Sequence, residues 1–171
     1  MKYLALVTLA AVLTAPAAWA ETNAANGPSG AHFASGSAEP VCTVGTGDQA
    51  QDVSCSGTTI GGVGHTNATA MLSATYSGTV QCRNHGGQIV DVKTQATTAS
   101  SSGQLTASKN GQLVVPPLSA AAPSAQQLLA QATCPNGNWT KQLEAGPTLT
   151  NFVYTLAFAG FTGPYISVTG P

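Results

Sequence analysis

Apolar and polar residues alternate along several stretches of this chain, the pattern of β-strands that bury one face. The clearest stretch carries apolar side chains at every second position: Ala68, Ala70, Leu72, Ala74 and Tyr76. A second stretch repeats the pattern with larger side chains: Phe152, Tyr154, Leu156 and Phe158. The two stretches predict two core strands, each turning one apolar face inward.

Turns separate the other predicted strands. Ser77-Gly78 predicts a turn that ends the first core strand. Asn110-Gly111 predicts a hairpin between strands over 105–108 and 112–115, because Asn-Gly favours tight hairpin turns. The Ser/Thr/Ala run over 97–102 predicts an exposed loop.

Two segments lack a strand period. Residues 119–132 contain the only candidate for a helix, with one or two turns over 124–129, but their Ala-rich composition suits a plain loop equally. Residues 21–39 consist largely of Ala, Gly, Ser, Asn and Pro, which predicts a flexible lead-in to the domain.

The first 20 residues predict a secretory signal peptide. A single lysine precedes a mostly apolar run over 3–13, and Ala18-Trp19-Ala20 forms the small-residue pattern of cleavage before Glu21. A transmembrane anchor would need roughly 20 apolar residues, more than this run supplies. We therefore expect a secreted protein, extracellular or periplasmic, with no transmembrane segment in its mature chain.

Removing the 20-residue leader from the 171-residue chain leaves 151 residues, enough for one domain with its own core. About eight strands with hardly any helix predict an all-β domain over residues 40–171. We expect a disulfide-stapled, Greek-key (immunoglobulin-like) β-sandwich, which fits the spacing of turns better than a closed barrel.

Charged residues are scarce, at 6% of the chain, so solubility has to come from Ser, Thr, Asn, Gln and Gly. Once Lys2 leaves with the leader, four basic residues face six acidic ones, a formal charge of −2. Nucleic-acid binding needs a basic stripe, and binding to anionic membranes needs a polybasic patch. The composition argues against both as partners.

All four cysteines lie beyond the leader, and an even count in an exported chain predicts two disulfides. Three pairings are possible. We expect sequence neighbours to pair, Cys42 with Cys55 and Cys82 with Cys134, for about 3 and about 4 kcal/mol of chain-entropy stabilisation. Trp139 is expected to pack beside the second bond. A zinc site is the alternative, but no two cysteines form a Cys-x-x-Cys pair.

The motifs at the second pair resemble those of a known group of proteins. Residues 82–87, Cys-Arg-Asn-His-Gly-Gly, and 134–139, Cys-Pro-Asn-Gly-Asn-Trp, are similar to Cys-Thr-Asn-x-Gly-Gly and Cys-Pro-Asn-x-Asn-Trp in small exported bacterial proteins. The resemblance covers most of the chain from Cys42 onward and implies an all-β, disulfide-bonded fold. The group has no assigned activity, so the resemblance implies no catalytic residue. The chain departs from the pattern at Arg83 and His85.

No residues are spaced as an active site or a metal site. His32 lies in the lead-in, and His65 and His85 fall in predicted turns, so each is expected to be a loop residue. Spacing gives no support to a dyad of His85 with a carboxylate such as Asp52. Asp48 and Asp52 offer too few oxygens for calcium, which takes roughly six or more. We therefore expect no catalytic residue, cofactor or metal.

Three functions remain open. The preferred one is a non-enzymatic structural or surface-associated protein that packs against cell-envelope or extracellular polymer, or against its own copies. The second is a glycan- or protein-binding module that uses loops at 85–88 or 147–151, and the third is an uncharacterised hydrolase. Tyr165, Phe161 and Phe33 discriminate between the first two, because an exposed aromatic cluster indicates binding and burial indicates structure.

Overall fold

The protein is an antiparallel β-structure with two disulfides. The computed structural model describes residues 18–46 and 51–171, and this part of the chain is 53% strand with one α-helix. The strands are β1 (Trp19–Thr22), β2 (His32–Phe33), β3 (Cys42–Val44), β4 (Val53–Cys55), β5 (Thr58–Gly61), β6 (Ala68–Arg83), β7 (Ile89–Leu105), β8 (Leu113–Val115), β9 (Leu118–Ala120), β10 (Thr140–Phe158) and β11 (Ile166–Gly170). The helices are the short 3-10 helix η1 (Ala24–Asn26) and α1 (Ala125–Gln131). The prediction of a β-rich, disulfide-bonded fold is confirmed.

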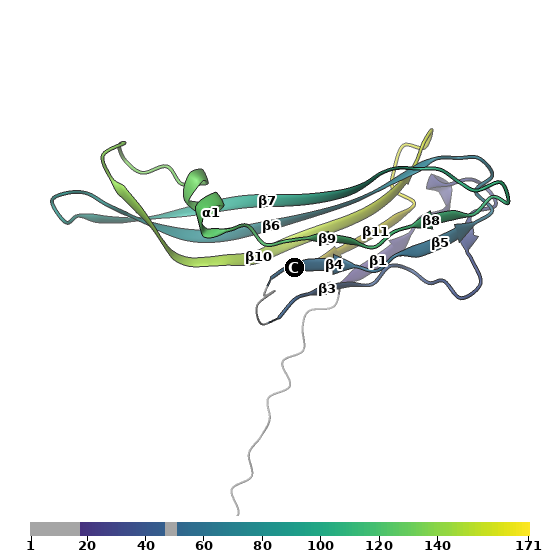
Figure 1. The fold of residues 1–171 in the computed structure, drawn as a ribbon, viewed down its shortest axis with the longest axis horizontal. Coiled ribbons are helices and arrows are strands. Elements are labelled where there is room, and N and C mark those ends of the chain that lie inside the picture. The colour runs from purple at the N-terminus through teal and green to yellow at the C-terminus, as the bar shows by residue number, and fades with distance from the viewer. Residues whose placement is uncertain (1–17, 47–50) are drawn as a thin grey trace, which may run out of the picture.

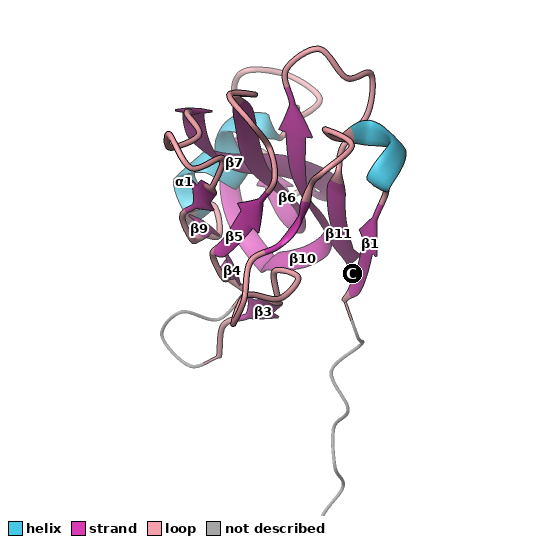
Figure 2. Ribbon diagram, turned by 90° about the vertical axis from the view of Figure 1, so that its right-hand side faces the viewer, coloured by secondary structure: helices cyan, strands magenta, loops and turns pink. Residues whose placement is uncertain are grey.

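The strands form two layers around one core. The first layer is a five-stranded sheet in the order β1-β11-β10-β6-β7. The second consists of two three-stranded pieces, β2-β5-β8 and β3-β4-β9, in which β4 runs on into β5 and β8 into β9. Figure 1 shows the second layer alongside the first, and Figure 2 gives the view along the long axis. Buried residues of both layers belong to one core cluster.

Two prolines divide the second layer into its two pieces. Pro116 and Pro117 lie between β8 and β9 and have no N–H to donate to the ladder. The facing strand passes so close that a Cβ on Gly57 would lie 2.6 Å from the carbonyl oxygen of Val115. Hydrogen bonding between the strands therefore stops at this point and resumes on the other side.

Small and large side chains face each other across the inner side of the first layer. Ala74 lies opposite Phe152, and Ala68 lies opposite Phe158. All four are at most 2% exposed. An alanine beside each large ring leaves room for the close packing that protein cores require. The two core strands predicted from alternation are thus confirmed, in adjacent positions.

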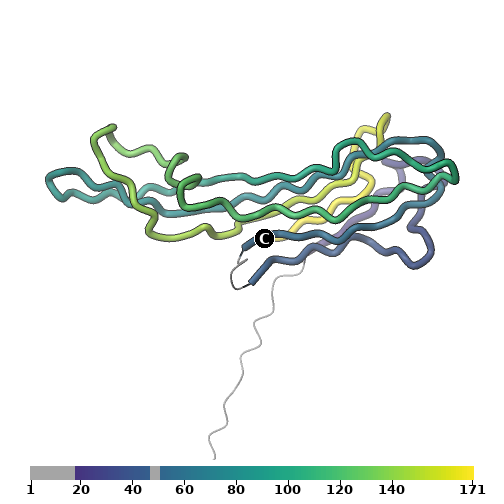
Figure 3. Tube along the Cα trace, viewed as in Figure 1, coloured from purple at the N-terminus to yellow at the C-terminus, as the bar shows by residue number. Residues whose placement is uncertain are grey.

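The three longest strands continue beyond the second layer. β6, β7 and β10 run side by side past the double-layered part and form a projecting extension (Figures 1 and 3). We call residues 78–94 and 124–146 the arm, and the double-layered part the body. The inward pattern of β6 persists in the arm at Val80 and Cys82, both fully buried. Here α1 and the loop after it cover the sheet.

Two predicted interruptions of these strands are wrong. β6 passes through Ser77-Gly78 without a turn. Gly78 instead packs closely against α1, since a Cβ there would lie 3.1 Å from Leu128 Cδ1. The run over 97–102 lies within β7 rather than in an exposed loop. Its residues alternate between half-buried and exposed, an order that a uniformly polar composition hides.

Asn110-Gly111 forms a turn but not a hairpin. The N–H of Ser108 donates to the carbonyl oxygen of Gln112 at 2.7 Å, which closes the turn. The strands on either side belong to different sheets, since β7 pairs with β6 and β8 pairs with β5. The turn carries the chain from the first layer to the second. The hairpin prediction is wrong because local turn chemistry does not specify strand partners.

The prediction of a flexible lead-in over 21–39 is also wrong. β1 pairs with β11, and β2 pairs with β5. Between them the N–H of Asn23 donates to Tyr165 O at 2.8 Å, and the N–H of Ala34 donates to Thr59 O at 2.9 Å. Backbone hydrogen bonds hold this segment in place. Because backbone groups form these bonds, they require no alternation of apolar side chains, and the sequence shows none. Residues 1–17, most of the predicted signal peptide, lie outside the described residues.

The buried tyrosines predict how the fold responds to alkali. Burial raises the pKa of Tyr154 from 10.0 to about 12, and it also raises the pKa of Tyr76 and of Tyr165. Folding therefore favours the neutral phenol, and this stabilisation is complete below pH 10 and is lost as the pH rises toward about 12. In the chain without residues 1–20, phenolate absorbance should stay low at pH 10 and rise only with loss of circular dichroism. The denaturant-unfolded chain is the control and should ionise near pH 10. Ionisation there with the fold intact would contradict the burial.

Candidate functional site

The arm depends on α1, which begins with a capping box. Ser124 Oγ accepts the N–H of Gln127 at 3.3 Å, and Gln127 Oε1 accepts the N–H of Ser124 at 2.7 Å. Leu128 is fully buried against Gly78 of β6. Of the two possibilities left open for this segment, helix and loop, the helix forms. The spacing Ser-x-x-Gln is the signal for it.

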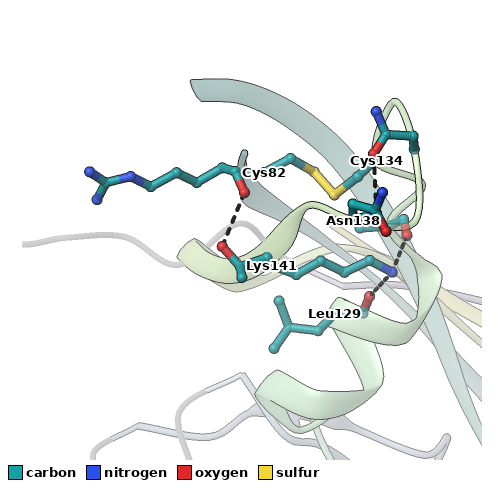
Figure 4. The surroundings of a disulfide bond; sticks show 9 residues. Cys82, Leu129, Cys134, Asn138 and Lys141 are labelled. Atoms are coloured by element: carbon teal, nitrogen blue, oxygen red, sulfur yellow. Dashed lines mark hydrogen bonds between the residues drawn. A yellow bond between two sulfur atoms is a disulfide. The ribbon is translucent and has the colours of Figure 1, made fainter. Parts of the chain in front are cut away.

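Lys141 of β10 fixes the other end of α1 to the arm. Its Nζ donates to the carbonyl oxygen of Leu129 at 3.1 Å and to that of Ala132 at 2.7 Å (Figure 4). The last turn of α1 contains no basic residue. Lys141 therefore supplies, from a neighbouring strand, the positive charge that stabilises the carbonyl end of a helix.

Both disulfides have the predicted pairing. Cys42 is bonded to Cys55 between β3 and β4, and Cys82 is bonded to Cys134 in the arm. All four thiols are thereby consumed, so the zinc alternative is wrong. The second bond ties the loop after α1 to the end of β6, as Figure 4 shows. A small separate core surrounds it, made of Val80, Cys82 and Ala132 with Val92, Leu129, Cys134, Trp139 and Leu143 packed around them.

The turn between β6 and β7 closes the end of the arm. The N–H of Asn84 donates to Gln88 O at 3.1 Å, and the N–H of Gln88 donates to Asn84 Oδ1 at 2.8 Å. Their side chains add a bond from Asn84 Nδ2 to Gln88 Oε1 at 2.8 Å. Gly87 takes a φ of +83°, which other residues rarely adopt. These bonds hold His85 and Gly86 exposed at the end of the arm.

The loop after Cys134 lies beside this turn. Asn136 Oδ1 accepts the N–H of Asn138 at 3.1 Å, so a side chain shapes this loop as well. The two loops together line a shallow depression of about 260 Å³, formed by Asn84, His85, Gly86, Asn136, Asn138 and Trp139. A second depression of about 440 Å³ adjoins it, shares Asn136 and Trp139, and extends to Thr133 and Lys141. We call these two depressions and their lining the tip.

The predicted loop residues lie apart. The expectation of a loop residue is wrong for His32, which lies in β2 with its Nδ1 2.8 Å from Gly30 O. His65 is exposed in a turn, and His85 is at the tip. Asp52 Oδ1 accepts the N–H of Ala122 at 2.7 Å. Asp48, the other calcium candidate, lies outside the described residues. Within the described ranges no three His, Cys, Asp or Glu side chains gather as metal ligands.

The three discriminating aromatics do not form an exposed cluster. Tyr165 is 3% exposed and packs edge-on against Phe158, with ring centroids 5.3 Å apart. Phe33 is half-buried against the core, and Phe161 is 36% exposed. The predicted binding loop at 147–151 is wrong, because these residues lie within β10. Trp139, to which the sequence assigns only packing beside the disulfide, is half-buried and therefore partly accessible.

A separate hollow, apart from the two depressions of the tip, lies in the body and is mostly apolar. It has a volume of about 650 Å³ and separates the end of β3 from β10 and the C-terminus. Its lining includes Ala18, Cys42, Val44, Leu149 and Phe152. Among the described residues that line this groove, none has an ionisable side chain, whereas the tip combines an aromatic ring with amide, imidazole and backbone polar groups.

The position of Trp139 beside the Cys82–Cys134 bond predicts different effects for the two disulfides. Cys82→Ser/Cys134→Ser should loosen the arm, at a cost of up to about 4 kcal/mol, and expose Trp139. In the chain without residues 1–20 this is the sole tryptophan, so its fluorescence emission should shift to longer wavelength. The matched variant Cys42→Ser/Cys55→Ser should lose about 3 kcal/mol from the body with emission unchanged below its melting temperature. Equal emission shifts in the two variants would contradict a separate small core around the Cys82–Cys134 bond.

Comparison of the chain with protein-family models, with curated proteins and with solved structures finds no match.

Proposed function

We propose that this chain is an exported, non-enzymatic structural or surface-associated protein whose arm makes contact with cell-envelope or extracellular polymer. The observation that carries the proposal is the length of β6, β7 and β10, which span 16, 17 and 19 residues. Strands in globular domains average about five or six residues. The body needs only part of each long strand, and the arm requires a helix, a disulfide and Lys141 to hold it. The arm lies outside the body and needs these additional interactions to stay folded. Such an extension is suited to reaching another molecule.

The covalent framework supports export. Disulfides persist in oxidising compartments, and this chain forms two of them. No helix in the described ranges combines the length and apolarity needed to cross a bilayer. The leader pattern over residues 1–20, with its small residues before Glu21, is in keeping with secretion.

We also propose that the body is a Greek-key, immunoglobulin-like β-sandwich. Support comes from the connections, because the chain changes layer between β5 and β6, between β7 and β8, and between β9 and β10. β10 then pairs with β6 rather than with the strand that precedes it. A strand that returns beside an earlier one after such a crossover is the characteristic step of a Greek key.

Export makes a prediction about mass. The full chain expressed in a bacterium with an oxidising periplasm should be recovered from that compartment as a protein that begins at Glu21. Its intact mass should be lower by four hydrogens than after reduction, because two disulfides are lost on reduction. Recovery of a chain that retains residues 1–20 in the membrane fraction would refute the localisation.

The surface role predicts binding that depends on the arm. The protein beginning at Glu21 should co-sediment saturably with isolated bacterial cell envelopes. Cys82→Ser/Cys134→Ser should weaken this binding by about tenfold, because a loosened arm must be ordered again before contact. The control Cys42→Ser/Cys55→Ser also lacks one disulfide but keeps the Cys82–Cys134 bond of the arm, so it should bind like the parent.

Two results would count against this function. Equal loss of binding in both disulfide variants would show that the arm is not the contacting element. Absence of both envelope binding and self-association in velocity sedimentation, or turnover of any ester, glycoside or peptide substrate, would refute the structural role itself.

A further inference from the structure

The tip combines an aromatic surface with polar groups that both donate and accept hydrogen bonds. Trp139 is half-buried and lines both depressions. Asn138 is exposed beside it, and an amide side chain offers two donors and one acceptor. Asn136 uses its Oδ1 within the loop, which leaves its Nδ2 as a further donor. His85 completes the polar side of the smaller depression.

The tip has little free charge. Among the described residues, no carboxylate lines either depression. The one ammonium group in this lining, that of Lys141, is committed to the carbonyl oxygens of Leu129 and Ala132. A phosphate or nucleic-acid ligand would need free cationic groups, and a metal ion would need anionic oxygens. The composition therefore favours a neutral, polar ligand.

The loops that form the tip are held in place before any ligand arrives. The Cys82–Cys134 bond fixes one loop, and the reciprocal bonds between Asn84 and Gln88 fix the other. Preorganised loops lose little conformational entropy on binding. The two adjoining depressions, of about 260 and 440 Å³, are open and shallow, which suits successive units of a polymer better than an enclosed small molecule.

We propose that the tip is a binding site for a neutral carbohydrate, with Trp139 as the surface on which a sugar ring lies. A pyranose ring presents C–H groups on its faces, which pack on an aromatic ring, and hydroxyl groups at its edge, which match amide donors and acceptors. Asn138 and His85 bind hydroxyl groups beside the stacked ring. The inference rests on the proposed function, because it specifies the chemistry of the polymer that the arm contacts.

Chemical treatment of the envelopes tests the class of ligand before the ligand itself is identified. Periodate cleaves vicinal diols of sugars and leaves peptide bonds intact, whereas protease does the reverse. Envelopes oxidised with periodate and then reduced should lose binding of the protein that begins at Glu21, and protease-treated envelopes should retain it. Loss with protease and retention after periodate would identify a protein partner. That result would overturn the carbohydrate site and leave the surface role standing.

Paired variants locate the site. Asn138→Ala/His85→Ala changes two exposed side chains at the tip and should weaken envelope binding by about tenfold, the effect of losing one or two hydrogen bonds. The control His65→Ala/Asn151→Ala makes the same two changes at exposed positions in the body and should bind like the parent. Both variants should melt like the parent, since none of the four side chains is buried.

The stacking role of Trp139 has its own readout. Sugar packed on the indole should change Trp139 fluorescence when envelope polysaccharide, released and deproteinised, is added to the protein that begins at Glu21. Cys42→Ser/Cys55→Ser should show the same change, because it leaves the tip intact. An unchanged emission, unweakened binding by the tip variant, or no binding to untreated envelopes would each overturn the carbohydrate site.

Discussion

The structure depends on covering one continuous face of β6. Inward-facing residues run without interruption from Ala68 to Cys82, and each of them, Gly78 included, is buried. In the body the second layer provides the cover, with β-strands from three passes of the chain. In the arm, a seven-residue helix and the loop after it cover this face. An isolated helix of this length is unstable in water, so the arm relies on the capping box, Lys141 and the Cys82–Cys134 bond. The two disulfides therefore do different things: one reinforces an existing strand pair, whereas the other holds a layer that would otherwise detach.

The same dependence explains which parts of the fold are predictable from the sequence. Period-two alternation identifies the inner faces around Leu72 and Tyr154 because these faces are apolar in every alternate position. Turn residues are less reliable. Ser77-Gly78 has the composition of a turn, but the strand continues through it, and Leu128, from a segment 50 residues further along the chain, packs closely on its glycine. Asn110-Gly111 does turn, yet the partner of each flanking strand is set by packing between layers. In both cases the contact that decides the structure joins residues far apart in the sequence, and no local sequence pattern indicates it.

The candidate site shows a similar division. Among the three possible pairings, the expected bond between Cys82 and Cys134 places their two segments together, and the structure contains this bond. They do not indicate that the pair stands at the end of a projecting arm, because that follows from the combined length of three strands. The sequence does not indicate the link from Lys141 to α1 either, because the acceptors are backbone carbonyl groups, which every residue possesses. The sequence links Trp139 to the disulfide through burial alone. Its half-buried position, next to the loop that the Asn136 side chain shapes, is seen only in the structure.

Low charge limits how such a protein can recognise anything. With 6% charged residues, its long-range field neither steers charged polymers toward the surface nor repels them effectively. Recognition has to arise from contacts at short range, and such contacts require groups that are exposed, polar and already fixed in position. Half of the exposed Ser and Thr side chains in the described residues lie on strands, where they offer hydration but no concave site. The tip differs because two loops, each stabilised by an asparagine side chain, meet around a tryptophan. The Cys82–Cys134 disulfide holds these two loops together. It thereby stabilises the arm and also fixes the geometry that the tip presents to a ligand.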